Sequence, residues 1–243
     1  MPVELYLDLH SQPCRSVFIF AKINQIPFQY KAVDLAAGEN HAEEFGKVSQ
    51  IRKVPVLKDG DFILTESVAI LQYLARKHGT PHHWYPADNL EKCARVDEFL
   101  SWQHTNIRTN GSKVFWFRGV LPVVTGAPVP KEKMDAAVED LNLSLKIFED
   151  KFLQNRPFVT GDQISLADLV GIVEIMQPVA TGLDVFEGRP VLSAWRDRVK
   201  KEIGLEVFDE AHKVIMNVDS LPQIFENKGL PEFLKMKIQK MFN

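Results

Sequence analysis

Residues 3–21 read VELYLDLHSQPCRSVFIFA, and this stretch decides how the chain begins to fold. Apolar and polar side chains alternate from residue 3 to residue 9, which is the pattern of a strand with one buried face. From residue 14 the apolar side chains follow helical spacing, and Pro13 suits the first turn of a helix. The stretch therefore predicts a strand followed directly by a helix, with Ser11 at the junction.

The composition is that of a globular protein with an ordinary charge balance. The chain has 243 residues, of which 45% are hydrophobic and 25% charged, so it can bury a sizeable core. A formal net charge of −3 argues against a protein that binds nucleic acid. Only two cysteines, no secretory leader and no apolar run of roughly 20 residues predict a cytoplasmic protein without disulfides or membrane spans. His82-His83 has no cysteine or spaced partner, so no metal site is expected.

The first 79 residues predict an α/β domain. A second strand is expected at residues 28–33 and a polar helix at about 40–48. Residues 53–65 place two short apolar runs around Asp59-Gly60, a strong hairpin signal, and a helix follows at 66–78. The first two strands need a helical crossover and so should be parallel, whereas the hairpin is antiparallel. The order β-α-β-α-β-β-α thus predicts a mixed four-stranded sheet.

The rest of the chain predicts a second, all-α domain. Residues 80–90 are rich in glycine, proline and polar side chains, which is typical of a linker. From there to residue 243 no strand is convincing. The helices expected in this domain are at about 91–118, 131–154, 165–178, 190–202, 206–217 and 230–242.

Three roles are open for Ser11. A serine hydrolase would need Gly-x-Ser-x-Gly or a histidine and an acid in reach, and the motif is absent. Ser11-Gln-Pro-Cys14 resembles the redox motif Cys-x-x-Cys, but a serine cannot form a mixed disulfide, so two-thiol redox chemistry is excluded. The residue types alone leave two alternatives: a hydroxyl that donates to a ligand, or a helix cap.

Five segments together form a combination that is specific although each is common alone. They are residues 3–15 quoted above, 53–67 (KVPVLKDGDFILTES), 94–98 (ARVDE), 164–169 (ISLADL) and 185–190 (VFEGRP). The combination resembles the cytosolic glutathione S-transferases, and the theta class in particular, nearly from end to end. The resemblance implies a thioredoxin-like N-terminal domain at residues 1–79, an all-α domain at 91–243 that binds the electrophile, and a homodimer.

The resemblance implies that Ser11 is catalytic, and elementary chemistry explains why. A cysteine thiol titrates near 8.5, so most glutathione is protonated at neutral pH, while the thiolate is the nucleophile. A hydroxyl that donates to the sulfur favours the thiolate, as do free N–H groups at a helix N-terminus. Cys14 is the rival, because omega-like members use a cysteine for thiol transfer; its other reading is a small buried side chain. Arg15 either steers anions or forms an ion pair.

The resemblance also implies the residues that bind glutathione. Val54-Pro55 is expected to be a cis bond whose neighbouring backbone groups pair with the cysteine of glutathione. Ser67 and the helix N–H groups suit the γ-glutamyl carboxylate, and Glu66 suits its ammonium. Lys53 and His41 are candidates for the glycine carboxylate. The loop reads Gly38-Glu39-Asn40-His41 where theta relatives show Gly-Gln-His, so either Asn40 or His41 makes the contact.

The electrophile pocket is expected between the domains. The long helix from about 91 would line it, and the C-terminal segment 231–242 would cover it as a lid. The side chains expected there are Gln103, Arg108, Trp116 and Leu234. Asn110-Gly111 is unfavourable within a helix and predicts a bend in this wall. Asp168 is assigned to folding, because Ser165-x-x-Asp168 has the form of a capping box.

The predicted activity is conjugation of glutathione to small apolar electrophiles such as halides and epoxides, with reduction of organic hydroperoxides as a second activity. Glutathione is the co-substrate, and no metal or prosthetic group is expected. The alternatives are a thiol transferase that uses Cys14 and a non-catalytic binding or scaffolding protein. A site that had lost its catalytic function would have no reason to keep all four of these residues: Ser11, Lys53, Glu66 and Ser67.

Overall fold

A computed structural model describes residues 2–216, and its N-terminal part is built on a four-stranded sheet. The strands lie in the order β2-β1-β3-β4, with β1 parallel to β2 and antiparallel to β3, and with β3 antiparallel to β4. The predicted mixed sheet and hairpin are therefore confirmed. The elements are β1 (Val3–Leu7), α1 (Gln12–Ile23), β2 (Phe28–Ala32), α2 (Glu43–Val48), β3 (Val56–Asp59), β4 (Phe62–Leu64) and α3 (Ser67–Lys77).

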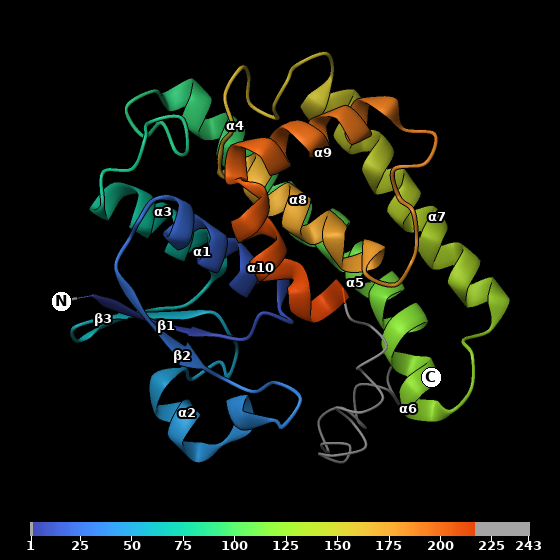
Figure 1. Ribbon diagram of the computed structural model, residues 1–243, viewed down its shortest axis with the longest axis horizontal. Coiled ribbons are helices and arrows are strands. Elements are labelled where there is room, and N and C mark those ends of the chain that lie inside the picture. The colour runs from blue at the N-terminus through green and yellow to red at the C-terminus, as the bar shows by residue number, and fades with distance from the viewer. Residues whose placement is uncertain (1, 217–243) are drawn as a thin grey trace.

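The sheet has helices on both faces, as a thioredoxin-like domain does. In Figure 1, α1 and α3 lie over one face and α2 lies under the other. The alternation in β1 buries Val3, Leu5 and Leu7 completely or nearly so, and these side chains join the main core with α1. Because residues 14–21 of α1 are all buried, this helix is enclosed between the sheet and the helical part of the chain.

The second part of the described chain is all helical. A turn of 3-10 helix (Glu39–His41) precedes α2, and π-helical segments (His104–Arg108, Trp116–Val120, Phe148–Leu153) extend α4, α5 and α7. Between residues 2 and 216, no helix has both the length and the apolarity that crossing a membrane requires. The helices are α4 (Leu90–Gln103), α5 (Thr109–Phe115), α6 (Leu121–Thr125), α7 (Lys131–Ile147), α8 (Leu166–Val179), α9 (Pro190–Ile203) and α10 (Leu205–Met216).

Two sequence predictions about the first long helix need correction. The expected end near residue 118 is wrong, because helical backbone continues to Thr125 and stops at Gly126, which has a φ of 69°. Pro122 does not break it, since this proline lies in the first turn of α6, where its missing N–H is tolerated. The irregular backbone lies in the π-helical segments rather than at Asn110-Gly111, which is within α5. Gly111 instead leaves room for the ring of Pro178, which packs closely against the backbone at this position.

Helix α8 is the centre of the helical part, and its start is fixed as the sequence predicts. In Figure 1 it runs through the middle of the helices, and all but one of its residues are buried. The capping box is confirmed: Ser165 and Asp168 cap the helix reciprocally. A side chain on α8 therefore reaches toward α1 on one side and α5 on the other, which matters for the site below.

Replacing Gly171 with alanine should destabilise the protein even though alanine favours helices. A Cβ at this position in α8 would lie 3.1 Å from Cζ of Phe99 and 3.6 Å from the Trp195 ring. Both rings are fully buried, so neither can move aside without displacing other core side chains. Overpacking costs about 1–3 kcal/mol, more than the ~1 kcal/mol that alanine gains in helix propensity. Chemical denaturation of Gly171→Ala checks this, and an unchanged or raised midpoint would contradict it.

Candidate active site

Ser11 occupies the N-cap position of α1, yet its side chain does not cap the helix. Its backbone has φ −85° and ψ 124°, and its N–H donates to the carbonyl of Asp8 at 3.0 Å. The side chain makes no capping hydrogen bond. Of the two alternatives that the sequence leaves open, the cap is therefore not used. A half-buried hydroxyl sits instead beside the N–H groups of a twelve-residue helix, where negative charge is favoured.

Cys14 lies one turn later in the interior. Its side chain is fully buried, and burial raises the pKa of its thiol to about 12, although hydrogen bonding with Ser11 acts in the opposite direction. Few such thiols are ionised at neutral pH, and the thiolate is the reactive form. The arrangement thus disfavours Cys14 as a nucleophile.

The sheet register gathers the other predicted residues at the same edge as Ser11. Tyr6 pairs with Val56, and Leu57 pairs with Leu64. Continuing these antiparallel registers places Val54 beside the end of β1, and Glu66 beside Pro55. The Val54–Pro55 bond is cis, as predicted. Two strand spacings separate β1 from β4, roughly 10 Å, which matches the length of an extended tripeptide.

Glu66 and Ser67 form the start of α3 in an unusual backbone conformation. Glu66 has a φ of 67°, a region that L-residues with side chains rarely occupy, and its exposed side chain does not cap the helix. Ser67 follows as the first helical residue and is 6% exposed. Strained non-glycine residues persist where the surrounding structure requires them, often at ligand sites. The strained Glu66 and the uncapped N-terminus of α3 mark this corner as a place for an anionic group.

The loop before α2 places the side chains of Asn40 and His41 differently. Asn40 is 8% exposed, and its side-chain amide donates to the backbone carbonyl of Arg52 at 2.9 Å. Arg52 in turn donates to the carbonyls of His41 and Ala42. The Asn40 side chain is thus used within the loop, while those of His41 and Lys53 are exposed. The Asn40 side chain is therefore buried within the loop, and the His41 side chain lies at its surface.

The predicted pocket wall divides into interior and half-buried residues. Gln103 is fully buried, so it has no exposed surface. Its side-chain amide donates to the carbonyl of Leu100 at 3.2 Å. Arg108 has a side chain 16% exposed and donates to Glu174 through Nε at 2.8 Å and Nη2 at 2.6 Å. Trp116 is half-buried against the core. Leu234 and the expected lid lie outside the described residues.

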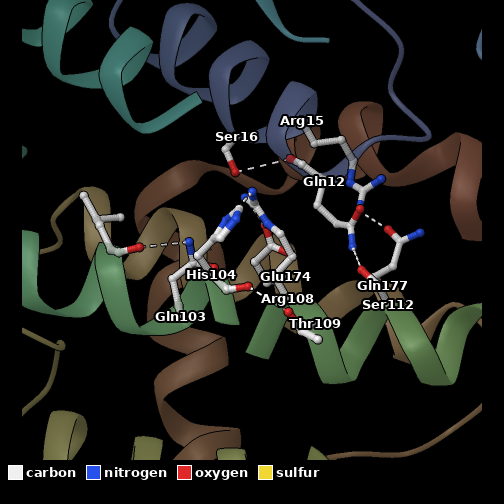
Figure 2. A network of polar contacts seen from close by, with 11 residues as sticks. Gln12, Arg15, Ser16, Gln103, His104, Arg108, Thr109, Ser112, Glu174 and Gln177 are labelled. Atoms are coloured by element: carbon white, nitrogen blue, oxygen red, sulfur yellow. Dashed lines mark hydrogen bonds and ion pairs between the residues drawn. The ribbon is translucent and has the colours of Figure 1, made fainter. Parts of the chain in front are cut away.

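Two residues that the sequence did not assign tie the serine loop to the helical part, as Figure 2 shows. Gln12 donates to Oγ of Ser112 in α5 at 2.8 Å. Arg15, fully buried, donates through Nη1 to the carbonyl of Leu9 at 2.7 Å, and its other terminal nitrogen donates to Gln177 in α8. An arginine within an otherwise apolar helical run was the only signal of this role. Of the two readings the sequence left open for Arg15, the buried position excludes steering of anions at the surface.

The described part of the chain holds no group of three or more histidine, cysteine or acidic side chains arranged to bind a metal. The predicted site residues offer a hydroxyl, two helix N-termini, an exposed acid, an exposed lysine and an exposed histidine.

Two family models match the chain. Residues 1–76 match the model described as Glutathione S-transferase, N-terminal domain, and residues 114–202 match Glutathione S-transferase, C-terminal domain. Among curated proteins, the chain is 53% identical to glutathione S-transferase theta-1 of Bos taurus over 239 residues, which cover 97% of this chain and 99% of the relative. It is 52% identical to the Homo sapiens theta-1 protein over 222 residues, 91% of this chain and 92% of the relative.

Solved structures agree in architecture. The apo form of human glutathione S-transferase T1-1 superposes with a TM-score of 0.90 at 48% identity, covering 98% of this chain and 97% of that one. A human theta-class enzyme in complex with the glutathione conjugate of 1-menaphthyl sulfate gives 0.90 at 44% identity, covering 99% and 98%.

Proposed function

This chain belongs to the glutathione S-transferase family, in its theta class, and from that premise we propose that Ser11 donates a hydrogen bond to the sulfur of glutathione and holds it as a thiolate. The family conjugates glutathione to electrophiles. What we propose for this chain is the role of Ser11 in that reaction. The single observation that carries it is the Ser11 hydroxyl, placed at the N-terminus of α1 and not used to cap that helix.

The energies involved are sufficient for the proposed step. Lowering a thiol pKa by one unit requires about 1.4 kcal/mol of preference for the thiolate. A hydrogen bond to a charged acceptor contributes about 1.5–3 kcal/mol, and the end of the helix adds about 0.3–1 kcal/mol. Together they bring a thiol of pKa near 8.5 to about the pH of the cell or below. Ser11 stays protonated throughout, so no general base is needed at this position.

The remaining contacts orient glutathione along the sheet edge. The Val54 backbone pairs with the cysteine of glutathione, next to Pro55. Ser67 and the N–H groups of α3 receive the γ-glutamyl carboxylate, and Glu66 receives the γ-glutamyl ammonium. His41 and Lys53 bind the glycine carboxylate at the other end, where both side chains are exposed. In this arrangement each charged end of glutathione has its own set of contacts, and the sulfur lies beside Ser11.

The electrophile approaches from the side of Arg108 and Trp116. A half-buried indole offers an apolar surface, and a guanidinium favours leaving groups that depart as anions. We therefore propose small alkyl and arylalkyl electrophiles, halides and epoxides among them, with organic hydroperoxides as a second substrate class. The theta-class neighbour that holds the glutathione conjugate of 1-menaphthyl sulfate is in keeping with an arylalkyl group bearing an anionic leaving group. The working form would be a cytoplasmic homodimer.

Cys14→Ala should leave conjugation within about twofold of wild type, because a buried thiol of pKa about 12 takes no part in the reaction. In the native protein a thiol reagent should label Cys93, which is partly exposed, and label Cys14 only after unfolding. The measurements are thiol counting and a conjugation panel of halides, epoxides and hydroperoxides on wild type, Cys14→Ala and Ser11→Ala. If Cys14→Ala abolished turnover while Ser11→Ala did not, a thiol transferase would replace the proposed function.

A further inference from the structure

Glu174 is a charged side chain that no part of the proposed mechanism uses, and it is completely buried in α8. Its Oε1 accepts from both Nε and Nη2 of Arg108. Its Oε2 is buried and has no hydrogen-bond partner among the described residues. A buried carboxylate is costly unless its charge is compensated, so its position calls for a role.

A second arginine, which comes from the other part of the chain, lies near Glu174 without a direct hydrogen bond to it among those found in the described residues. Arg15 in α1 is fully buried; burial lowers the pKa of its guanidinium to about 10, and the charge of Glu174 is the largest effect that opposes this. Arg15 also donates to Gln177, one turn after Glu174 on α8. Figure 2 shows Arg15 directed to Gln177, with Glu174 and Arg108 together beside them. The Glu174 carboxylate thus pairs directly with the partly buried Arg108, and its charge also acts on the fully buried Arg15.

Arg15 connects this network to the serine. Its Nη1 donates to the carbonyl of Leu9 at 2.7 Å and to that of His10 at 3.2 Å, the two residues directly before Ser11. We propose that Glu174 is a positioning residue for thiolate formation: by balancing Arg15 against Arg108, it holds the Leu9-His10 backbone and so fixes where the Ser11 hydroxyl points. The inference rests on the proposed role of Ser11 and extends it to a residue on another helix.

The other ionisable groups around the network do not take over this role. Asp8 is occupied by the backbone N–H and ring of His10 and by the Leu35 N–H. His104 contacts the far side of Arg108 at 3.1 Å. Burial lowers the pKa of His212, from α10, to about 3, so this ring is neutral during an assay. Among the groups described, only Glu174 balances both arginines.

The decisive variant is Glu174→Gln, which keeps the size and an acceptor oxygen but removes the charge. Arg15 and Arg108 then both lose the negative charge of Glu174, and we expect Arg15 to hold the Leu9-His10 carbonyls less firmly. We expect the ultraviolet thiolate signal of enzyme-bound glutathione to titrate about one pH unit higher than in wild type, which is tenfold less thiolate below the midpoint. Affinity for S-methylglutathione, which has no thiol to ionise, should change less than twofold. A purely structural role would not shift the titration selectively.

Two further variants complete the experiment. Glu149→Gln is the control for removing a paired carboxylate elsewhere, since Glu149 pairs with Arg189 at 3.0 Å and its side chain is 17% exposed; its midpoint should equal that of wild type. In Glu174→Gln/Arg108→Gln one arginine remains, which restores the wild-type net charge, so the midpoint should return to wild type. This variant decides the matter even if the single one unfolds.

The outcomes separate the inference from the proposed function. If the wild-type complex shows no thiolate below the range of free glutathione, the role of Ser11 fails. If wild type shows the lowered midpoint and Glu174→Gln shares it, or lowers it further, only the role of Glu174 is overturned. A shifted midpoint in the charge-balanced double variant would overturn it as well.

Discussion

Ser11→Ala is expected to lower kcat for conjugation by roughly 30- to 140-fold, because a charge-assisted hydrogen bond of about 2–3 kcal/mol is lost and each 1.4 kcal/mol is a factor of ten. The methyl group that remains fills the same position at the start of α1 but cannot donate to the sulfur. Binding of glutathione should persist, since the proposed contacts to its two ends lie elsewhere on the sheet edge. Steady-state kinetics at neutral pH, with S-methylglutathione affinity alongside, measure both effects.

Two controls make this result specific. Ser16→Ala makes the same chemical change on the same helix, at a buried hydroxyl that faces the carbonyl of Gln12 at 3.4 Å, and should leave kcat unchanged. Ser11→Thr retains a hydroxyl and should recover part of the lost rate. Raising the pH should also rescue Ser11→Ala, because glutathione then ionises without help. Turnover in Ser11→Ala that equals wild type would exclude the serine mechanism.

Asp168→Ala is expected to be the most destabilising single substitution discussed, by about 3–5 kcal/mol, because it leaves buried donors without partners. Oδ1 of Asp168 accepts from the Val159 N–H at 2.8 Å and from Nε1 of Trp195 at 2.9 Å. Oδ2 accepts from the N–H and the hydroxyl of Ser165, both at 3.0 Å. The carboxyl therefore fixes the start of α8, a preceding loop and α9 at once.

Chemical denaturation followed by circular dichroism tests this expectation. Asp168→Asn keeps the volume but offers one acceptor oxygen and an NH2 group, so its stability should fall between those of alanine and wild type. Asp197→Ala on α9 is the control, because this carboxylate is largely exposed and pairs only with its neighbour Arg196. If Asp168→Ala unfolded at the denaturant concentration of the control, the four hydrogen bonds would not have the weight assigned to them.

Local sequence patterns predicted most of the architecture. The alternation from residue 3 to residue 9, the Asp59-Gly60 turn and the Ser165-x-x-Asp168 box each act within a few residues, so the sequence alone predicted a strand, a hairpin and a capped helix. The structure has all three. The motifs also pointed to the family, because their combination is rare even though each one is common.

Helix limits and side-chain partners were less accessible from sequence. The first long helix was expected to end near residue 118, whereas Pro122 lies in the first turn of α6 and is tolerated there, which only the backbone before it reveals. Gln103 was assigned to the pocket from its position on a helix, but the packing of α4 turns it inward. A periodic pattern says which residues share a face of a helix. It does not say what covers that face.

By itself, then, the sequence determined the two kinds of domain, the strand-to-helix junction and the residue types along the sheet edge, because these depend on contacts between near neighbours in the chain. Only the tertiary structure decided that the Ser11 hydroxyl does not cap α1, that Cys14 is buried in the core, and that the buried Glu174 pairs with Arg108. Arg108 and Glu174 are 66 positions apart. Their meeting depends on how α1, α5 and α8 pack together, and no local pattern encodes that packing.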